Sequence, residues 1–108
     1  MKDDKLIQSY IPMSETAYYI LLSLLLDERH GYAIMQYVEE LTKGRIRLGA
    51  GTLYGTLSKM EKGGLIEVAA EAEKRKIYRI TGFGKDVLLT EIRRIRELYH
   101  NSKGVAVE

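Results

Sequence analysis

The sequence predicts a single, mainly helical domain with one small β-hairpin. The chain has 108 residues, which is enough for one domain and too few for two domains with separate cores. Apolar residues recur at helical spacing in four stretches. Between the third and fourth stretches the pattern changes to the alternation of two short strands. We therefore expect residues 1–108 to fold as one unit.

The first two helices are predicted from caps and periodicity. Ser14 is a good N-cap, and the chain is apolar on nearly every side from Ala17 to Leu26, which predicts a buried central helix over Ser14–Asp27. A charged break then precedes a second helix over His30–Thr42, with His30 capping or packing at its start. One face of this helix carries Ile34, Tyr37, Val38 and Leu41.

The second half of the chain contains a short helix, a hairpin and a long helix. After a connector over 45–51, Leu53, Leu57 and Met60 form the inner face of a third helix that ends at Gly63 and Gly64. Two strands follow, marked by Ile66 with Val68 and by Tyr78 with Ile80. Thr81 is the predicted N-cap of a last helix over 82–100, and residues 101–108 read as a tail.

Three helices followed by a hairpin are the arrangement of a winged helix-turn-helix. We assign residues 14–81 to this DNA-binding region and residues 82–100 to a dimerisation helix. In such a fold the third helix enters the major groove and the hairpin, or wing, lies alongside on the backbone.

The charge distribution agrees with a DNA-facing side. The net charge is only +2, but residues 43–79 hold nine basic and four acidic side chains, a net charge of +5. This asymmetry favours a polyanion as partner. The exposed side of the third helix and the wing supply the candidate DNA contacts, which are Thr52, Tyr54, Gly55, Ser58, Lys59, Lys62, Lys74, Arg75 and Lys76.

Five short segments also carry a resemblance to a known family. They are Leu21–Leu25, His30–Ile34, Gly51–Leu57, Gly64–Ile66 and Lys76–Thr81. Together they resemble the PadR family of transcriptional regulators over about Ser14 to Tyr99. The resemblance implies a homodimeric, double-stranded DNA-binding repressor that often responds to a small aromatic or toxic compound. The length is similar to that of short members with a single C-terminal dimerisation helix.

Two positions depart from the family's pattern. The wing tip, residues 70–75, has no glycine and carries two acids, so we expect backbone contacts from its cations and not deep insertion into a minor groove. Gly82 and Gly84 fall in the first turn of the last helix, where each weakens helix formation by up to about 1 kcal/mol. Close packing of the wing against this helix is the expected reason.

The last helix predicts a homodimer. A chain this short has little core against which to bury an apolar stripe, so we expect the stripe to face a second copy. Its members are Val87, Leu88, Ile92, Ile95, Leu98 and Tyr99. Where the first and last helices pack, Tyr18, Tyr19 and Tyr99 are candidates for an effector pocket. Ordinary core or interface packing of these tyrosines is the favoured alternative.

Other function classes have little support in the sequence. The chain has no cysteine, and His30 and His100 lack partners at metal-ligand spacing, so neither a metal site, a cofactor nor an enzyme is expected. No stretch is long enough to span a membrane, and a cytoplasmic location is expected. A winged-helix module that binds a protein and not DNA remains the alternative function.

Overall fold

The computed structural model describes residues 2–106 and contains five helices and three strands in that range. The elements are α1 (Lys2–Ser9), α2 (Glu15–Leu26), β1 (Arg29–His30), α3 (Gly31–Leu41), α4 (Ala50–Lys62), β2 (Ile66–Ala72), β3 (Arg75–Ile80) and α5 (Gly82–Asn101). The predicted fold class, a winged helix-turn-helix followed by a long C-terminal helix, is therefore confirmed. Residues 107–108 of the predicted tail lie outside the described range.

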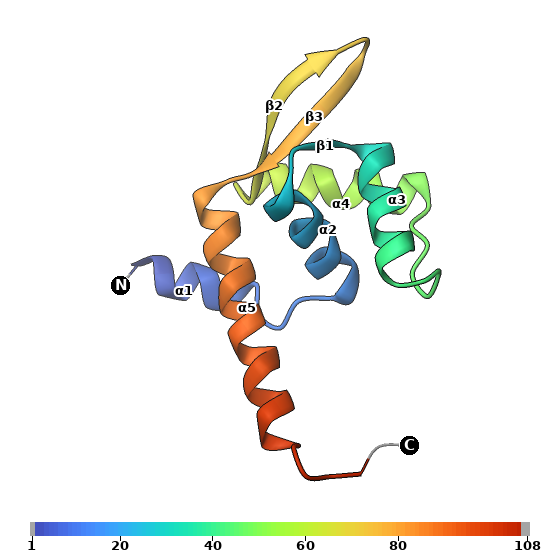
Figure 1. The fold of residues 1–108 in the computed structure, drawn as a ribbon. Helices are drawn as coiled ribbons and strands as arrows, with labels where there is room; N and C mark the ends of the chain where they lie inside the picture. Colours follow the sequence, from blue (N-terminus) through green and yellow to red (C-terminus); the bar gives the residue numbers. More distant parts are fainter. Residues whose placement is uncertain (1, 107–108) are drawn as a thin grey trace.

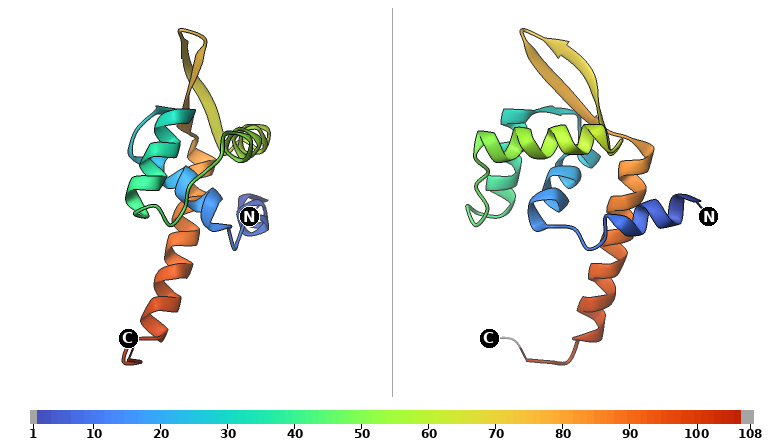
Figure 2. Two further views of the ribbon diagram at one scale, coloured as in Figure 1. Left: turned by 90° about the vertical axis from the view of Figure 1, so that its right-hand side faces the viewer. Right: turned by 180° about the vertical axis from the view of Figure 1, so that it is seen from behind.

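The wing and α5 extend from opposite ends of a helical body. Helices α2, α3 and α4 pack together, the β2–β3 hairpin projects above them, and α5 runs downward from the base of the wing (Figure 1). Helix α1 lies against α5 (Figure 2). Because the end of α5 extends beyond the body, Leu98 and Tyr99 near its C-terminus are exposed. No helix within residues 2–106 is long and apolar enough to cross a lipid bilayer.

The core is built from the inner faces that the periodicity predicts. Leu53, Leu57 and Met60 of α4 are buried, as are Ile34 and Val38 of α3. The remaining buried apolar residues come from α2, the loop before α4, the base of the wing and α5, and are Ile20, Leu21, Leu24, Leu48, Leu65, Ile66, Tyr78, Val87 and Leu88. The prediction that α2 is buried all round is wrong at its end, because Leu26 is 62% exposed.

The wing is the predicted two-stranded hairpin with one strand more. In its register Ile66 pairs with Ile80 and Val68 with Tyr78. The charged break before α3 is not a simple loop, because Arg29 and His30 form β1 and pair with β3. The sheet order is β1-β3-β2. This short strand holds the start of α3 against the wing.

Side-chain caps define three of the helix starts. The Ser14 hydroxyl accepts a hydrogen bond from Ala17 N, and the Thr81 hydroxyl accepts one from Gly84 N, so both predicted N-caps are confirmed. His30 Nδ1 accepts from Ala33 N at 3.2 Å and caps α3. Helix α4 begins at Ala50, so the last two residues of the predicted connector are helical.

Two features were not predicted correctly from the sequence. Helix α1 was not predicted; its Ile7 packs against the core, while Leu6 is 49% exposed. The prediction that Val87 and Leu88 face a second copy is wrong, because both are fully buried within the protomer's own core. Beyond the partly buried Ile92, the exposed apolar residues of α5 are Ile95, Leu98 and Tyr99.

The two glycines at the start of α5 have different surroundings. A Cβ at position 84 would overlap the carbonyl oxygen of Leu65, which lies at the base of the wing. That same oxygen accepts hydrogen bonds from the Thr81 backbone and hydroxyl. The expected close packing of wing and helix is confirmed at Gly84. It is absent at Gly82, where a Cβ would meet nothing within 4 Å.

Candidate nucleic-acid interface

The predicted contact residues of α4 are all exposed on one side of the helix. These are Thr52, Tyr54, Gly55, Ser58, Lys59 and Lys62. At about 100° per residue, Gly55 and Lys62 point almost directly away from the buried face, whereas Tyr54 and Thr52 lie on opposite flanks. The Tyr54 flank adjoins the wing. The Lys59 flank adjoins a mostly apolar hollow of about 310 Å³ beside Tyr10 and Met13.

Ion pairing separates the basic residues of the 43–79 segment into two groups. Both arginines that precede the wing are paired, Arg45 with Glu15 at 2.6 Å and Arg47 with Glu39 at 3.8 Å. In the wing, Arg79 pairs across the strands with Glu67 at 2.7 Å. Within residues 2–106 the other basic side chains of this segment form no ion pair, and they are Lys43, Lys59, Lys62, Lys74, Arg75 and Lys76. Five of these six are predicted DNA contacts.

The wing tip is a two-residue turn. Ala72 pairs with Arg75, and Glu73 and Lys74 between them have φ values of 52° and 64°. Two consecutive residues with positive φ are typical of a type I′ turn, which usually contains Asn and Gly. The turn therefore holds Lys74 and the neighbouring Arg75 in an exposed position at the end of a tight hairpin.

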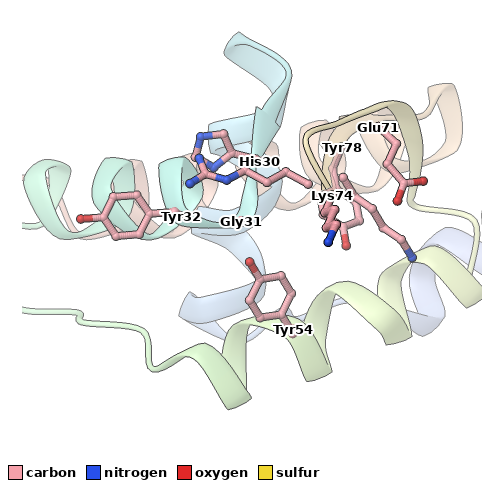
Figure 3. Close-up of a pocket in the computed structure, with 9 residues that line it drawn as sticks. His30, Gly31, Tyr32, Tyr54, Glu71, Lys74 and Tyr78 are labelled. Carbon is pink, nitrogen blue, oxygen red and sulfur yellow. The ribbon is translucent and has the colours of Figure 1, made fainter.

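A cleft of about 550 Å³ separates the wing from α3 and α4 (Figure 3). Its walls bring the predicted residues Tyr54, Lys74, Arg75 and Lys76 together. They also include residues outside the predicted contact set, which are His30, Gly31, Tyr32, Glu71 and Tyr78. The predicted interface therefore has a wall formed by the start of α3.

Glycine at position 31 has a steric role in this cleft. A Cβ there would lie 2.5 Å from the Tyr54 hydroxyl oxygen, so only glycine allows the Tyr54 ring to reach the start of α3. Figure 3 shows this hydroxyl directed toward Gly31. In the sequence, His30 and Gly31 stand directly before an amphipathic helix, which is a signal for this site. Nothing in the spacing of the residues indicates that Tyr54 of α4 lies against Gly31.

Two of the three predicted effector-pocket tyrosines lie together. The rings of Tyr18 and Tyr19 meet edge to face with centroids 5.6 Å apart, and they line a cavity of about 350 Å³. Glu15, Glu91 and Arg94 contribute its charged groups. Burial, followed by Tyr19 and Glu91, raises the pKa of Tyr18.

Tyr99 does not belong to that cavity within one protomer. It is 65% exposed near the end of α5, with its ring 6.0 Å from that of His100 and the Lys103 ammonium 5.9 Å away. The prediction that all three tyrosines meet is therefore wrong for the single chain. The reason is the length of α5, which carries Tyr99 beyond the helical body.

Comparisons with known proteins agree with this architecture. Residues 20–90, more than half of the chain, match the family described as "Transcriptional regulator PadR-like family". The chain is 33% identical over 75 residues to "Transcriptional regulator Rv3488" of Mycobacterium tuberculosis, covering 67% of each chain.

Solved structures of similar fold include two bacterial proteins. One is a PadR family transcription regulator of Clostridium difficile, with 28% identity, a TM-score of 0.67 and coverage of 80% of this chain and 93% of that one. A PadR-like transcription factor of Bacteroides fragilis has 25% identity and a TM-score of 0.71, with coverage of 93% and 98%. With its winged helix-turn-helix and its family match, this chain belongs to the PadR-like family of transcriptional regulators.

Proposed function

We propose that this PadR-like regulator acts in the cytoplasm by binding double-stranded DNA sequence-specifically, with α4 in the major groove and the wing on the backbone. One observation carries the proposal. The cations of the 43–79 segment that lack a carboxylate partner are concentrated on the exposed side of α4 and at the wing tip. Cations without partners are available to neutralise phosphates, whereas each paired arginine already lies beside a carboxylate.

The glycine in the middle of α4 supports the same role. Gly55 is exposed and has nothing within 4 Å that a Cβ would meet, so the packing of this chain does not require glycine there. Glycine costs an exposed helix about 1 kcal/mol relative to alanine. Close approach of the helix backbone to the floor of a groove would explain this cost, because a side chain at the centre of the exposed face would keep the two apart.

A salt titration of DNA binding tests the proposal. The logarithm of the affinity for the protein's own promoter should fall with the logarithm of salt concentration, with a slope near −0.9 for each phosphate contact. Lys59→Ala and Lys62→Ala should each reduce that slope by about 1. Lys103→Ala, just beyond the C-terminal end of α5, is the control. A wild-type chain that binds no promoter DNA would support the alternative, a winged-helix module that binds a protein.

We further propose that the regulator is a homodimer formed through α5. Ile95, Leu98 and Tyr99 are 40%, 52% and 65% exposed on a helix that leaves the body. A second copy would cover them in a symmetric contact. A two-fold axis between the copies would place two α4 helices about 34 Å apart, one turn of DNA, on a near-palindromic site.

We also propose that the chain is a repressor released by a small, flat aromatic effector in the cavity beside Tyr18 and Tyr19. Support comes from a link between this cavity and α4. Glu15 lines the cavity and pairs with Arg45, which belongs to the connector that leads to α4. A ligand that displaces Glu15 would disturb this connector. Calorimetry with and without operator DNA should show that effector and DNA weaken each other's binding, and equal effector affinity in both conditions would contradict this coupling.

A further inference from the structure

A largely buried tyrosine, Tyr78, lines the cleft beneath the wing and has a hydroxyl that the fold does not use. Tyr78 is only 6% exposed, and its hydroxyl makes no hydrogen bond within residues 2–106. No polar side-chain atom in the described part of the chain is both sealed from solvent and unpaired. The Tyr78 oxygen must therefore reach solvent, and the cleft that Tyr78 lines is where it does so (Figure 3).

A second hydroxyl approaches the same cleft from α4. The Tyr54 hydroxyl lies against Gly31, the first residue of α3, and it too has no hydrogen-bond partner within residues 2–106. The two hydroxyls thus come from the wing and from α4, and the positive end of the α3 dipole lies next to one of them. Burial, Glu61 and Tyr54 together raise the pKa of Tyr78, so this hydroxyl keeps its proton and remains a donor at neutral pH.

The charges that border the cleft favour an anion. Side chains alternate along a strand, so Lys76 and Tyr78 point from the same face of β3. Lys74 and Arg75 add two further cations at the rim. The one carboxylate in the lining is Glu71, which lies opposite Lys76 in the register of the two strands without forming an ion pair with it. The lining of the cleft therefore holds three cations and two hydroxyl donors but one carboxylate.

We infer that this cleft seats one phosphate of the DNA backbone, with the hydroxyls of Tyr54 and Tyr78 as hydrogen-bond donors and Lys76 as the facing cation. The inference rests on the proposed DNA binding and adds Tyr78, which the sequence predicted only as a strand residue. The wing then holds DNA with its inner wall, close to α3, and not by insertion of its tip. Glu71 repels the same phosphate and limits the affinity.

The test measures DNA affinity and salt slope for variants of the full chain. Tyr78→Phe and Tyr54→Phe should each weaken binding about tenfold, because each removes one hydrogen bond to a charged group. The loss should be equal for operator and unrelated DNA, since a phosphate carries no sequence information. The salt slope should not change, because a hydroxyl is neutral. Lys76→Ala should reduce the slope by about 1, and Glu71→Gln should tighten binding.

Tyr37→Phe is the matched control, because Tyr37 lies on α3 under Arg29 and outside the cleft. The urea midpoint of every variant shows whether it is folded, and the half-exposed Tyr54 keeps the test valid if the buried Tyr78→Phe unfolds. A wild-type chain that binds no DNA contradicts the proposed function itself. If the wild-type chain binds DNA and the two tyrosine variants have unchanged affinity, only the proposed phosphate-binding site in the cleft is overturned.

Discussion

The carboxylate of Glu91 accepts a hydrogen bond from the backbone amide of Met13 at 2.7 Å, joining α5 to the segment that precedes α2. The same carboxylate also accepts hydrogen bonds from Arg94, from Nε at 2.5 Å and from Nη2 at 3.0 Å. It is 1% exposed. A buried carboxylate thus fastens the N-terminal segment to the helix that carries the proposed dimer contact.

We expect Glu91→Gln to lower the free energy of unfolding by about 1–3 kcal/mol. An amide oxygen does not replace a charged acceptor of three hydrogen bonds, and hydrogen bonds to charged groups contribute about 1.5–3 kcal/mol. Urea denaturation measures the change. Glu97→Gln, an exposed carboxylate on the same helix, is the control and should leave stability unchanged. Equal midpoints for the two variants would contradict the role of Glu91.

The same carboxylate predicts an acid-dependent loss of stability. Arg94 and the Met13 amide hold the pKa of Glu91 below its ordinary value despite burial. A carboxyl whose folded pKa is lowered stabilises the fold above its unfolded pKa, about 4.3, and this contribution disappears as pH falls through the lower folded value. The difference in stability between wild type and Glu91→Gln should therefore shrink below about pH 4 in urea titrations. A difference that stays constant down to about pH 3 would exclude the charge as its cause.

Gly84→Ala should destabilise the chain, because the new methyl group meets the Leu65 carbonyl oxygen. Overpacking of this kind costs about 1–3 kcal/mol. Gly82→Ala is the matched control in the same turn of α5. It has open space and should raise stability by up to about 1 kcal/mol through helix propensity. Thermal unfolding of both variants should shift in opposite directions.

The wing turn should become more stable when its residues suit positive φ. Glu73→Asn combined with Lys74→Gly replaces two side chains that disfavour the left-handed region, and we expect a gain of about 1 kcal/mol. Glu73→Gln keeps the unfavourable backbone conformation and should change nothing. Denaturant midpoints distinguish the two variants, and a lower midpoint for the Asn-Gly turn would contradict the assigned turn geometry.

The proposed dimer predicts that Leu98→Glu dissociates the protein without unfolding it. The side chain is 52% exposed in a single chain, so its loss removes a contact between copies and little of the core. Leu41→Glu, a similarly exposed leucine at the end of α3, should leave the assembly intact. Sedimentation at micromolar concentration gives the mass of each variant. A wild-type monomer would contradict the proposed dimer.

Local patterns in the sequence were sufficient where a structural feature depends on neighbouring residues. The caps at Ser14, His30 and Thr81 follow from side chains that bond within the next three residues. The two strands of the wing follow from the alternation of apolar residues, Ile66 with Val68 and Tyr78 with Ile80. The exposed side of α4 follows from its 3.6-residue period.

Features that depend on distant residues were not predicted. Strand β1 is only two residues long, and its partner, β3, lies far along the chain. Helix α1 is only eight residues long and packs against α5, which is distant in the chain. The apolar stripe of α5 reads as continuous in the sequence, but the body covers Leu88 and leaves Leu98 exposed.

The sequence by itself determined the order of the main elements, the inner faces of their helices and the basic bias of residues 43–79. These properties are set by neighbouring residues and by the period of each element. Only the tertiary structure decided which cations are neutralised, where α5 leaves the body and how Tyr54 and Tyr78 come to share one cleft. Each of these depends on contacts between segments that are distant in the chain, and those contacts exist only after the core has formed.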